Sequence, residues 1–305
     1  MIKTIGRELG WRILVCSSLL IKYMPSGIIK ALQKIISGTA SLLLRSRNNV
    51  ALNNLNYVYG KEKNKKEIRH ILKSFMRNII EYYCELIKQD NKAYKDIKEL
   101  VHLEGRENLD KALGKGRGVI AVSAHLGNFP IVCARLTSEG YAYSAIIGNA
   151  RDERVKKYFS SIWENQGMEV IPSLPVFTAL KGTMEALSKN RIVAIYADQN
   201  RARGGIFVDF FGRKAATVTS PATIAIKMKV PVIPMFIVRI AGNKHKIVIE
   251  PELEIKFTGN EQEDISMITE KINRIIERYI KLYPEEWWWF HDRWKTKPKN
   301  TGESS

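Results

Sequence analysis

Two ionisable side chains follow short apolar runs, at the points where buried strands would end. His125 comes after residues 119–124, and Asp198 comes after the run RIVAIYA. A neutral imidazole at a strand end can take a proton from an alcohol, which is general-base chemistry. Gly127 and Asn128 follow the histidine closely. The alternative is a histidine that only satisfies backbone groups at the end of its strand.

Polar and cationic side chains lie directly behind the second strand end. The stretch ADQNRARGG contains Gln199, Arg201 and Arg203. Amide and guanidinium groups so close to a strand could bind a phosphate or polarise a carbonyl group. A solvated loop with an Asx turn would explain the same pattern. Arg151 and Arg154 follow a third predicted strand, where the start of a charged helix is the simpler local explanation.

The other reactive residue types indicate neither a metal site nor a disulfide. The cysteines are widely separated, which suits neither kind of site; they are Cys16, Cys84 and Cys133. Three histidines lie in charged surroundings and are expected at the surface: His70, His102 and His245. The segment EEWWWFHDRW follows the last predicted helix. Tryptophans at this density pack a core or sit at a membrane interface.

An α/β domain must position these residues. Short runs rich in Val and Ile begin after Gly114, with helical segments around residues 178–188 and 220–229 between some of them. The alternation predicts a mostly parallel central sheet that is flanked by helices. Sites in such sheets lie beyond the carboxyl ends of the strands, where His125 and Asp198 are expected. The runs are GVIAVSA, YSAIIG, EVIPS, RIVAIYAD, PVIPMFIVRI and KHKIVIEPELEI.

The chain before this domain is expected to be helical. Residues 1–47 are predicted to form basic, apolar helices that anchor the protein to a membrane, and residues 48–112 a helical cap or arm. The α/β domain then covers residues 113–298, and a polar tail covers residues 299–305. The uncharged run at residues 13–21 is about half of the roughly 20 residues that a spanning helix needs. Contact in the plane of a bilayer is therefore favoured, and packing on the protein's own core is the alternative.

The net charge of +18 attracts anionic surfaces. Phospholipid, phosphorylated sugar lipid, an acidic carrier protein and nucleic acid all qualify. Nucleic acid is disfavoured, because the basic residues are spread along the chain and the tryptophans are not interleaved as stacking positions. Charge alone does not choose among the other partners.

The order of these segments resembles the lysophospholipid acyltransferase superfamily, in particular its branch of bacterial lipid A late acyltransferases. The likeness rests on a basic apolar N-terminus, AHLGNF, ADQN followed by GGIFVDFFGRKAATVTSPATIAI, then PVIPMFIVR and PEEWWWFHDRWKTKP. It implies a glycerolipid acyltransferase-like α/β fold and an O-acyltransferase. Such an enzyme moves a fatty acyl chain from acyl carrier protein or acyl-CoA to a hydroxyl of a lipid A precursor or related lipid. It works at the cytoplasmic face of the bacterial inner membrane and needs no metal or other cofactor.

The resemblance also implies roles for single residues. His125 corresponds to the general base, and backbone donors near Gly127 and Asn128 would stabilise the oxyanion that forms on the thioester carbonyl. The loop at residues 198–203 would hold the polar head of the acceptor or donor, and the basic surface suits both an acidic carrier protein and lipid phosphate. The predicted substrate-binding residues are Gly127, Asn128, Arg151, Arg154, Gln199, Arg201 and Arg203.

One position departs from the family pattern. After the histidine and four further residues the family has a carboxylate that orients the imidazole, whereas HLGNFP has Pro130. A proline side chain can neither accept the ring N–H nor carry charge. Another carboxylate could reach His125, with Asp198 the first candidate because it ends a strand of the same sheet. Otherwise the histidine works unaided, or the chain is a catalytically impaired lipid-binding homologue. A lysophospholipid or another glycolipid is the alternative acceptor.

Overall fold

A seven-stranded sheet forms the centre of the protein. The computed structural model describes residues 2–25, 27–28, 45–89, 97–148 and 152–298. The strands are β1 (Val101–Glu104), β2 (Val119–Ser123), β3 (Tyr143–Ile147), β4 (Met168–Pro172), β5 (Ile192–Tyr196), β8 (Val232–Ile240) and β9 (Lys244–Ile249). Their order is β1-β9-β8-β2-β5-β3-β4, and every neighbouring pair is parallel except β8 with β9. The predicted α/β fold with a mostly parallel sheet is confirmed.

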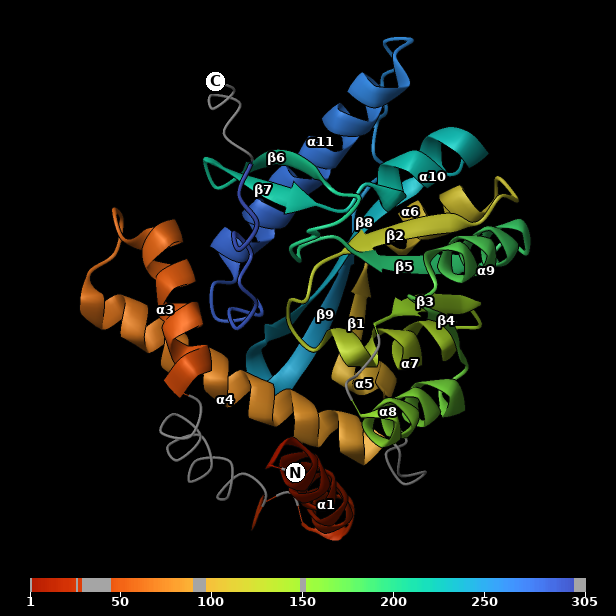
Figure 1. Cartoon of the computed structure of the whole chain (residues 1–305). Coiled ribbons are helices and arrows are strands. Elements are labelled where there is room, and N and C mark those ends of the chain that lie inside the picture. Colours follow the sequence, from red (N-terminus) through yellow and green to blue (C-terminus); the bar gives the residue numbers. More distant parts are fainter. Residues whose placement is uncertain (1, 26, 29–44, 90–96, 149–151, 299–305) are drawn as a thin grey trace.

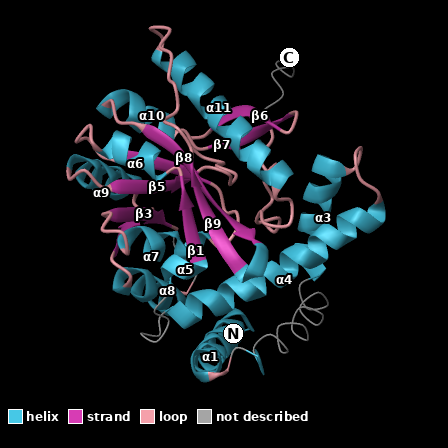
Figure 2. Ribbon diagram, turned by 180° about the vertical axis from the view of Figure 1, so that it is seen from behind, coloured by secondary structure: helices cyan, strands magenta, loops and turns pink. Residues whose placement is uncertain are grey.

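Helices cover both faces of this sheet (Figures 1 and 2). They are α1 (Ile2–Tyr23), α3 (Arg45–Tyr59), α4 (Lys65–Gln89), α5 (Ile97–Leu100), α6 (Arg106–Leu113), α7 (Val132–Thr137), α8 (Glu153–Asn165), α9 (Val176–Ser188), α10 (Ser220–Met228) and α11 (Glu261–Leu282). Alternate residues of β2 point to opposite faces. Ile120 and Val122 join the core under α9, α10 and α11, whereas Val119 and Ala121 join the core under α5, α6 and α7.

The first strand lies outside the predicted limits of the α/β domain. β1 precedes residue 113 and forms the edge of the sheet beside β9. The predicted boundary between the helical arm and the domain is therefore too late. The reason is physical: β1 reads VHLE, a short and partly charged sequence that suits a sheet edge and lacks the apolar run of a central strand.

Apart from β1, most of the described residues before residue 113 lie in helices. α3 and α4 pack together and against the α11 side of the core. α4 lies between α1 and the sheet (Figure 1). Residues 29–44 of the predicted membrane-anchoring helices, and the predicted tail at residues 299–305, lie outside the described residues. Within the part of the chain that is described, no helix combines the length and apolar character needed to cross a membrane.

The tryptophan-rich segment is part of the core. Trp287 and Trp289 are fully buried and Trp294 nearly so. The rings of Trp287 and Trp294 pack against Phe210 of the hairpin formed by β6 (Ile206–Phe210) and β7 (Arg213–Thr217), and Trp289 packs on Tyr59 of α3. Of the two uses predicted for these tryptophans, core packing is the one observed for these three.

Candidate active site

The strand order brings His125 and Asp198 together. β2 and β5 are parallel neighbours, and their register pairs Ser123 with Tyr196. His125 follows Ser123 at the same spacing as Asp198 follows Tyr196, so the two side chains meet at the carboxyl edge of the sheet. His125 Nδ1 lies 2.8 Å from Asp198 Oδ1. Of the alternatives that the sequence left open, a carboxylate from another segment is the one observed, because Asp198 reaches the imidazole.

Asp198 is a buried carboxylate with several hydrogen-bond donors. Besides the imidazole, its Oδ2 accepts from the backbone N–H of His125 at 3.1 Å and from Trp287 Nε1 at 2.8 Å. Burial alone would raise the pKa of Asp198, but the charge of His125 and these hydrogen bonds outweigh burial and hold that pKa below its ordinary value. An ionised Asp198 can only accept, so Nδ1 carries a proton, and in the neutral form of the imidazole the free electron pair is then on Nε2.

The free face of the imidazole is partly open. The His125 side chain is 23% exposed, which leaves room for a reacting group at Nε2. The rings of Phe129 and Tyr196 pack against it at centroid distances of 5.0 and 4.9 Å. Gln199 Nε2 lies 3.4 Å from His125 Nε2, so this predicted substrate-binding residue stands beside the nitrogen that would take a proton.

Pro130 lies in the wall of an apolar hollow next to the imidazole. It stands in the 3-10 turn η1 (Phe129–Ile131), which leads into α7. The hollow measures about 40 Å³. Its lining is Phe129, Pro130, Cys133, Tyr143, Ala145, Ile147, Trp163, Met168 and Tyr196. Because Asp198 already binds Nδ1, the imidazole does not need a second carboxylate at position 130 to orient it. Pro130 instead contributes apolar surface.

Restoring the family carboxylate at this position is expected to harm the protein. Pro130→Asp puts a charge into the apolar hollow, which should lower the free energy of unfolding by about 1–3 kcal/mol without raising turnover. Pro130→Ala keeps the wall apolar and is the matched control. Thermal unfolding and initial rates of both variants check this. A Pro130→Asp enzyme faster than wild type would mean that the position still needs a carboxylate.

The loop after His125 is held tightly by backbone contacts. Gly127 has φ of +62°, and a Cβ there would lie 2.1 Å from the carbonyl oxygen of Ile237, so glycine is required. The Gly127 N–H donates to the carbonyl of Glu286 at 2.9 Å. That N–H is therefore occupied, which argues against its predicted use as an oxyanion donor. Among the described residues, the backbone N–H of Asn128 has no hydrogen-bond acceptor.

The segment after α11 supports the site, and sequence reasoning did not place it there. Besides the bond from Trp287 to Asp198, the N–H of Trp288 donates to the carbonyl of His125 at 2.9 Å. His291 Nε2 accepts from the N–H of Asn200 at 2.8 Å. The density of tryptophan marked this segment as unusual, but no spacing in it pointed to His125.

The predicted arginines have different surroundings. Arg201 and Arg203 are exposed on the loop behind Asp198. Arg154 is not brought to His125: it pairs with Asp152 and Glu8 and lies over the ring of Trp11, so it ties α8 to α1. Arg151 lies outside the described residues.

His245 contradicts its prediction as a surface residue. It is fully buried in β9, and its Nε2 lies 2.8 Å from Glu85 Oε2 of α4. The reason is strand alternation: the flanking lysines are directed outward while His245 points inward. His70 is exposed, as predicted, and so is His102.

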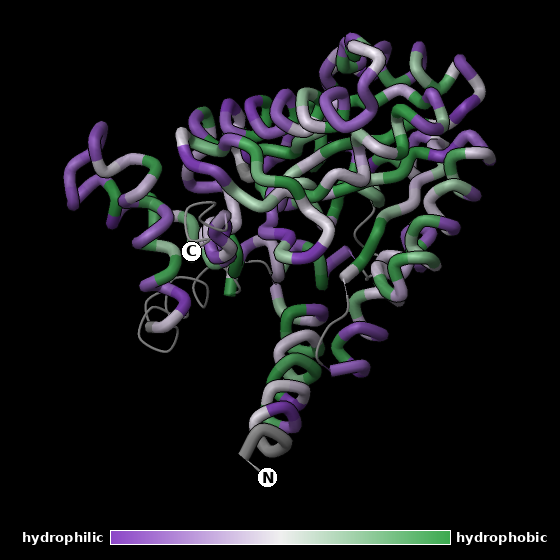
Figure 3. The backbone as a smooth tube through the Cα atoms, turned by 45° about the horizontal axis from the view of Figure 1, so that its top comes forward, coloured by the Kyte–Doolittle hydropathy of each residue, from purple (hydrophilic) through white to green (hydrophobic). Residues whose placement is uncertain are grey.

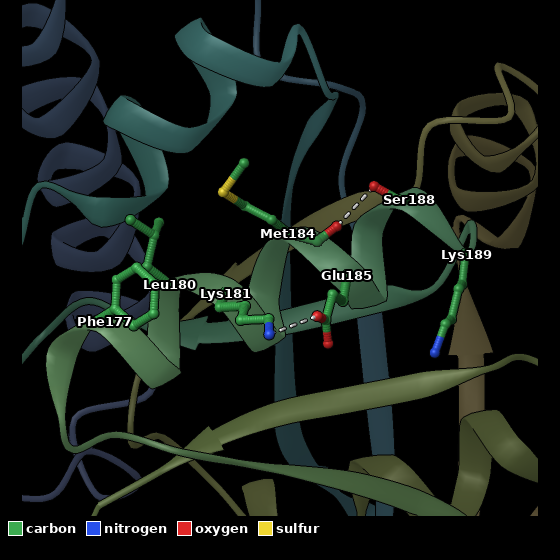
Figure 4. Close-up of a pocket in the computed structure, with 7 residues that line it drawn as sticks. All are labelled: Phe177, Leu180, Lys181, Met184, Glu185, Ser188 and Lys189. Atoms are coloured by element: carbon green, nitrogen blue, oxygen red, sulfur yellow. Dashed lines mark hydrogen bonds and ion pairs between the residues drawn. The ribbon is translucent and has the colours of Figure 1, made fainter.

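A second hollow lies on the outer surface of α9 (Figure 4). It measures about 460 Å³ and is lined by Phe177, Leu180, Lys181, Met184, Glu185, Ser188 and Lys189. All of these belong to or directly follow α9, and none contacts His125 or Asp198 in the structure. It is an apolar surface feature and does not form part of the site.

Known proteins share this sequence pattern along most of the chain. Residues 6–296 match the family described as bacterial lipid A biosynthesis acyltransferase. A phosphatidylinositol mannoside acyltransferase of Mycolicibacterium smegmatis is 25% identical over 231 residues, covering 74% of this chain and 72% of the relative. A lipid A biosynthesis palmitoleoyltransferase of Escherichia coli is 24% identical over 296 residues, covering 92% and 89%.

Proposed function

The chain belongs to the bacterial lipid A biosynthesis acyltransferase family and is a lipid acyltransferase, and from this premise we propose that it moves a fatty acyl chain from a thioester donor to a glycolipid hydroxyl. The donor is the acyl thioester of acyl carrier protein or of coenzyme A. The acceptor is a lipid A precursor or a related glycolipid. The observation that carries this proposal is the His125–Asp198 pair, in which Nε2 of the imidazole faces Gln199 and not Asp198, at the carboxyl edge of the sheet.

The reaction uses the imidazole as a proton carrier. His125 Nε2 takes the proton of the acceptor hydroxyl while its oxygen attacks the thioester carbonyl carbon, and Asp198 stabilises the imidazolium that forms. The carbonyl oxygen gains negative charge, which hydrogen-bond donors beside His125 would stabilise. The intermediate then breaks its C–S bond, and the leaving thiolate takes the proton back from His125. The products are an ester and a free thiol.

The polar head of the acceptor is proposed to lie over the loop behind Asp198. Arg201 and Arg203 are exposed there, and neither forms an ion pair with a carboxylate in the described part of the chain. Guanidinium groups bind phosphate oxygens in pairs and in a fixed geometry. A phosphorylated acceptor is therefore favoured over a neutral one. Gln199, beside His125 Nε2, is placed to contact the reacting hydroxyl.

Membrane contact is proposed for α1, which projects from the α/β body (Figure 3). Its inner face is bound to α4, since Ser17 and Ser18 each lie within 3.0 Å of the Tyr83 hydroxyl. Its outer face exposes Leu9, Ile13 and Leu20 by 59%, 59% and 60%. These positions recur at helical spacing and form one apolar stripe, which suits a helix lying in a bilayer surface.

Replacing two apolar residues of this stripe with glutamate should release the protein from membranes. The double variant Ile13→Glu and Leu20→Glu is expected to lower partitioning into anionic vesicles by about tenfold or more, because apolar burial is lost and charge repulsion is added. Vesicle sedimentation measures this. Phe177→Glu, on the exposed surface of α9, is the comparison variant. Loss of binding in Phe177→Glu alone would place the membrane contact on α9 instead.

The function is tested by mass spectrometry of lipid extracts. Purified protein is incubated with acyl carrier protein thioester or acyl-CoA and, separately, with a lipid A precursor, a phosphatidylinositol mannoside and a lysophospholipid. We expect one acyl mass to be added to a glycolipid. A product only with lysophospholipid would correct the acceptor class. No product from folded protein with any pair would favour the impaired lipid-binding homologue.

A further inference from the structure

A buried group of charged side chains lies behind the loop that follows His125. Glu85 comes from α4, Arg239 from β8 and His245 from β9. β8 and β9 are antiparallel, and their register places Arg239 opposite His245. No step of the proposed reaction uses these three residues. Charged groups are seldom buried unless they are paired, so their contacts are informative.

Arg239, His245 and Asn128 converge on one carboxylate, that of Glu85. Asn128 Nδ2 donates to Glu85 Oε2 at 2.6 Å, and His245 Nε2 lies 2.8 Å from the same oxygen. Arg239 Nη2 lies 3.4 Å from the other oxygen, Oε1. Burial would raise the pKa of Glu85, but the hydrogen bond and charge of His245, the charge of Arg239 and the bond from Asn128 outweigh it and lower that pKa. Glu85 is therefore an ionised acceptor.

Asn128 is the point where this group reaches the active-site loop. Asn128 is fully buried, and its Oδ1 has no hydrogen-bond partner within the described residues. The bond to Glu85 is thus the side-chain tie of Asn128. The backbone of the same loop is held by Glu286 through Gly127 and by Trp288 through the His125 carbonyl. The loop is fixed on one side by the C-terminal segment and on the other by α4.

We propose that Glu85 is a positioning residue for acyl transfer. It holds Asn128, and through Asn128 it sets the position of the loop that begins at His125. Arg239 and His245 in turn hold Glu85. This inference rests on the proposed function of His125. Displacement of a reacting group by about 1 Å can slow a reaction about 10²-fold, so such a tie affects the rate of chemistry.

The test exchanges the donor and the acceptor of the Glu85–Asn128 bond. Glu85→Gln and Asn128→Asp are each expected to lower kcat by about 10- to 100-fold, with KM changed by less than about threefold. The double variant Glu85→Gln/Asn128→Asp again pairs an amide with a carboxylate and keeps the net charge of the group. It is expected to recover to within about fivefold of wild type, since residues in direct contact are not additive.

The control variant removes the charge of Glu81, a carboxylate that contacts Arg239 and does not contact Asn128. Glu81 Oε2 lies 3.3 Å from Arg239 Nη2, so Glu81→Gln weakens the hold on that arginine alone. Its kcat is expected within about twofold of wild type. Asn128→Ala removes only the donor and leaves Glu85 paired with His245 and Arg239. Asn128→Ala is expected to show the same loss of kcat as Glu85→Gln. If Glu85→Gln does not fold, Asn128→Ala replaces it as the test of the Glu85–Asn128 bond.

Initial rates decide whether Glu85 positions the loop, and they are measured on variants whose thermal unfolding is also measured. Recovery in the double variant with Glu81→Gln unaffected supports the proposal. Wild-type kcat in Asn128→Ala, or a double variant no faster than its slower single variant, would overturn it. Absence of acyl transfer in the wild-type protein would instead overturn the proposed function, so the two failures are distinguishable.

Discussion

His125→Ala is expected to lower acyl transfer by about 10³- to 10⁴-fold, because the variant has no group that can take the proton of the acceptor hydroxyl. In the neutral imidazole Asp198 holds the proton on Nδ1, so Nε2 is the nitrogen of this partly exposed side chain that can accept a proton. Gln199 stands beside it, but an amide cannot act as a base at neutral pH.

The variant should remain folded. The His125 side chain is at the end of β2 and partly exposed, and its backbone N–H still reaches Asp198 after truncation. We expect the free energy of unfolding to fall by no more than about 1–2 kcal/mol, from the lost contacts with Phe129 and Tyr196 and the lost Nδ1 bond. Thermal unfolding measures this beside the mass-spectrometric assay of product.

His102→Ala is the matched control for this substitution. His102 lies on β1 and is exposed, so its removal changes the composition identically at a position far along the sheet from β2. It is expected to act like wild type. Turnover by His125→Ala at the rate of His102→Ala would exclude the imidazole from the mechanism.

The sequence predicted which segments of the α/β domain form strands better than it predicted which strands lie side by side in the sheet. Each Val- and Ile-rich run became a strand, and His125 and Asp198 were expected at the carboxyl edge. That β2 lies beside β5 is a property of the crossover connections, which no local pattern encodes. For this reason Asp198 could be named as a candidate partner of His125, while the 2.8 Å contact came only from the structure.

Parts of the site could not be predicted from the sequence because the residues that contact each other there are distant in the chain. His245 looked like a surface residue between two lysines, yet it meets Glu85, which lies 160 positions away. The indole of Trp287 donates to Asp198 across 89 positions, from a segment without helical or strand periodicity. Long-range polar pairs of this kind leave no spacing to detect, whereas apolar periodicity leaves a strong one.

Asp198→Asn is expected to lower kcat by about 10²- to 10⁴-fold, the range for loss of an acid that orients a catalytic histidine. An asparagine at 198 could present its NH₂ group to Nδ1. The imidazole would then carry its proton on Nε2 and could no longer accept one from the acceptor. Even with the amide oxygen turned toward Nδ1, the negative charge that stabilises the imidazolium is gone.

Asp209→Asn makes the same chemical change where no catalytic role is expected. Asp209 Oδ1 accepts from the N–H of Gly212 at 2.9 Å in the β6–β7 hairpin, and an asparagine oxygen can accept the same bond. Its rate should stay within about twofold of wild type. Initial rates of the two variants, at equal folded protein, give the comparison. Equal and small effects would show that His125 works without a carboxylate, and Pro130 would then mark a family member that has dispensed with one.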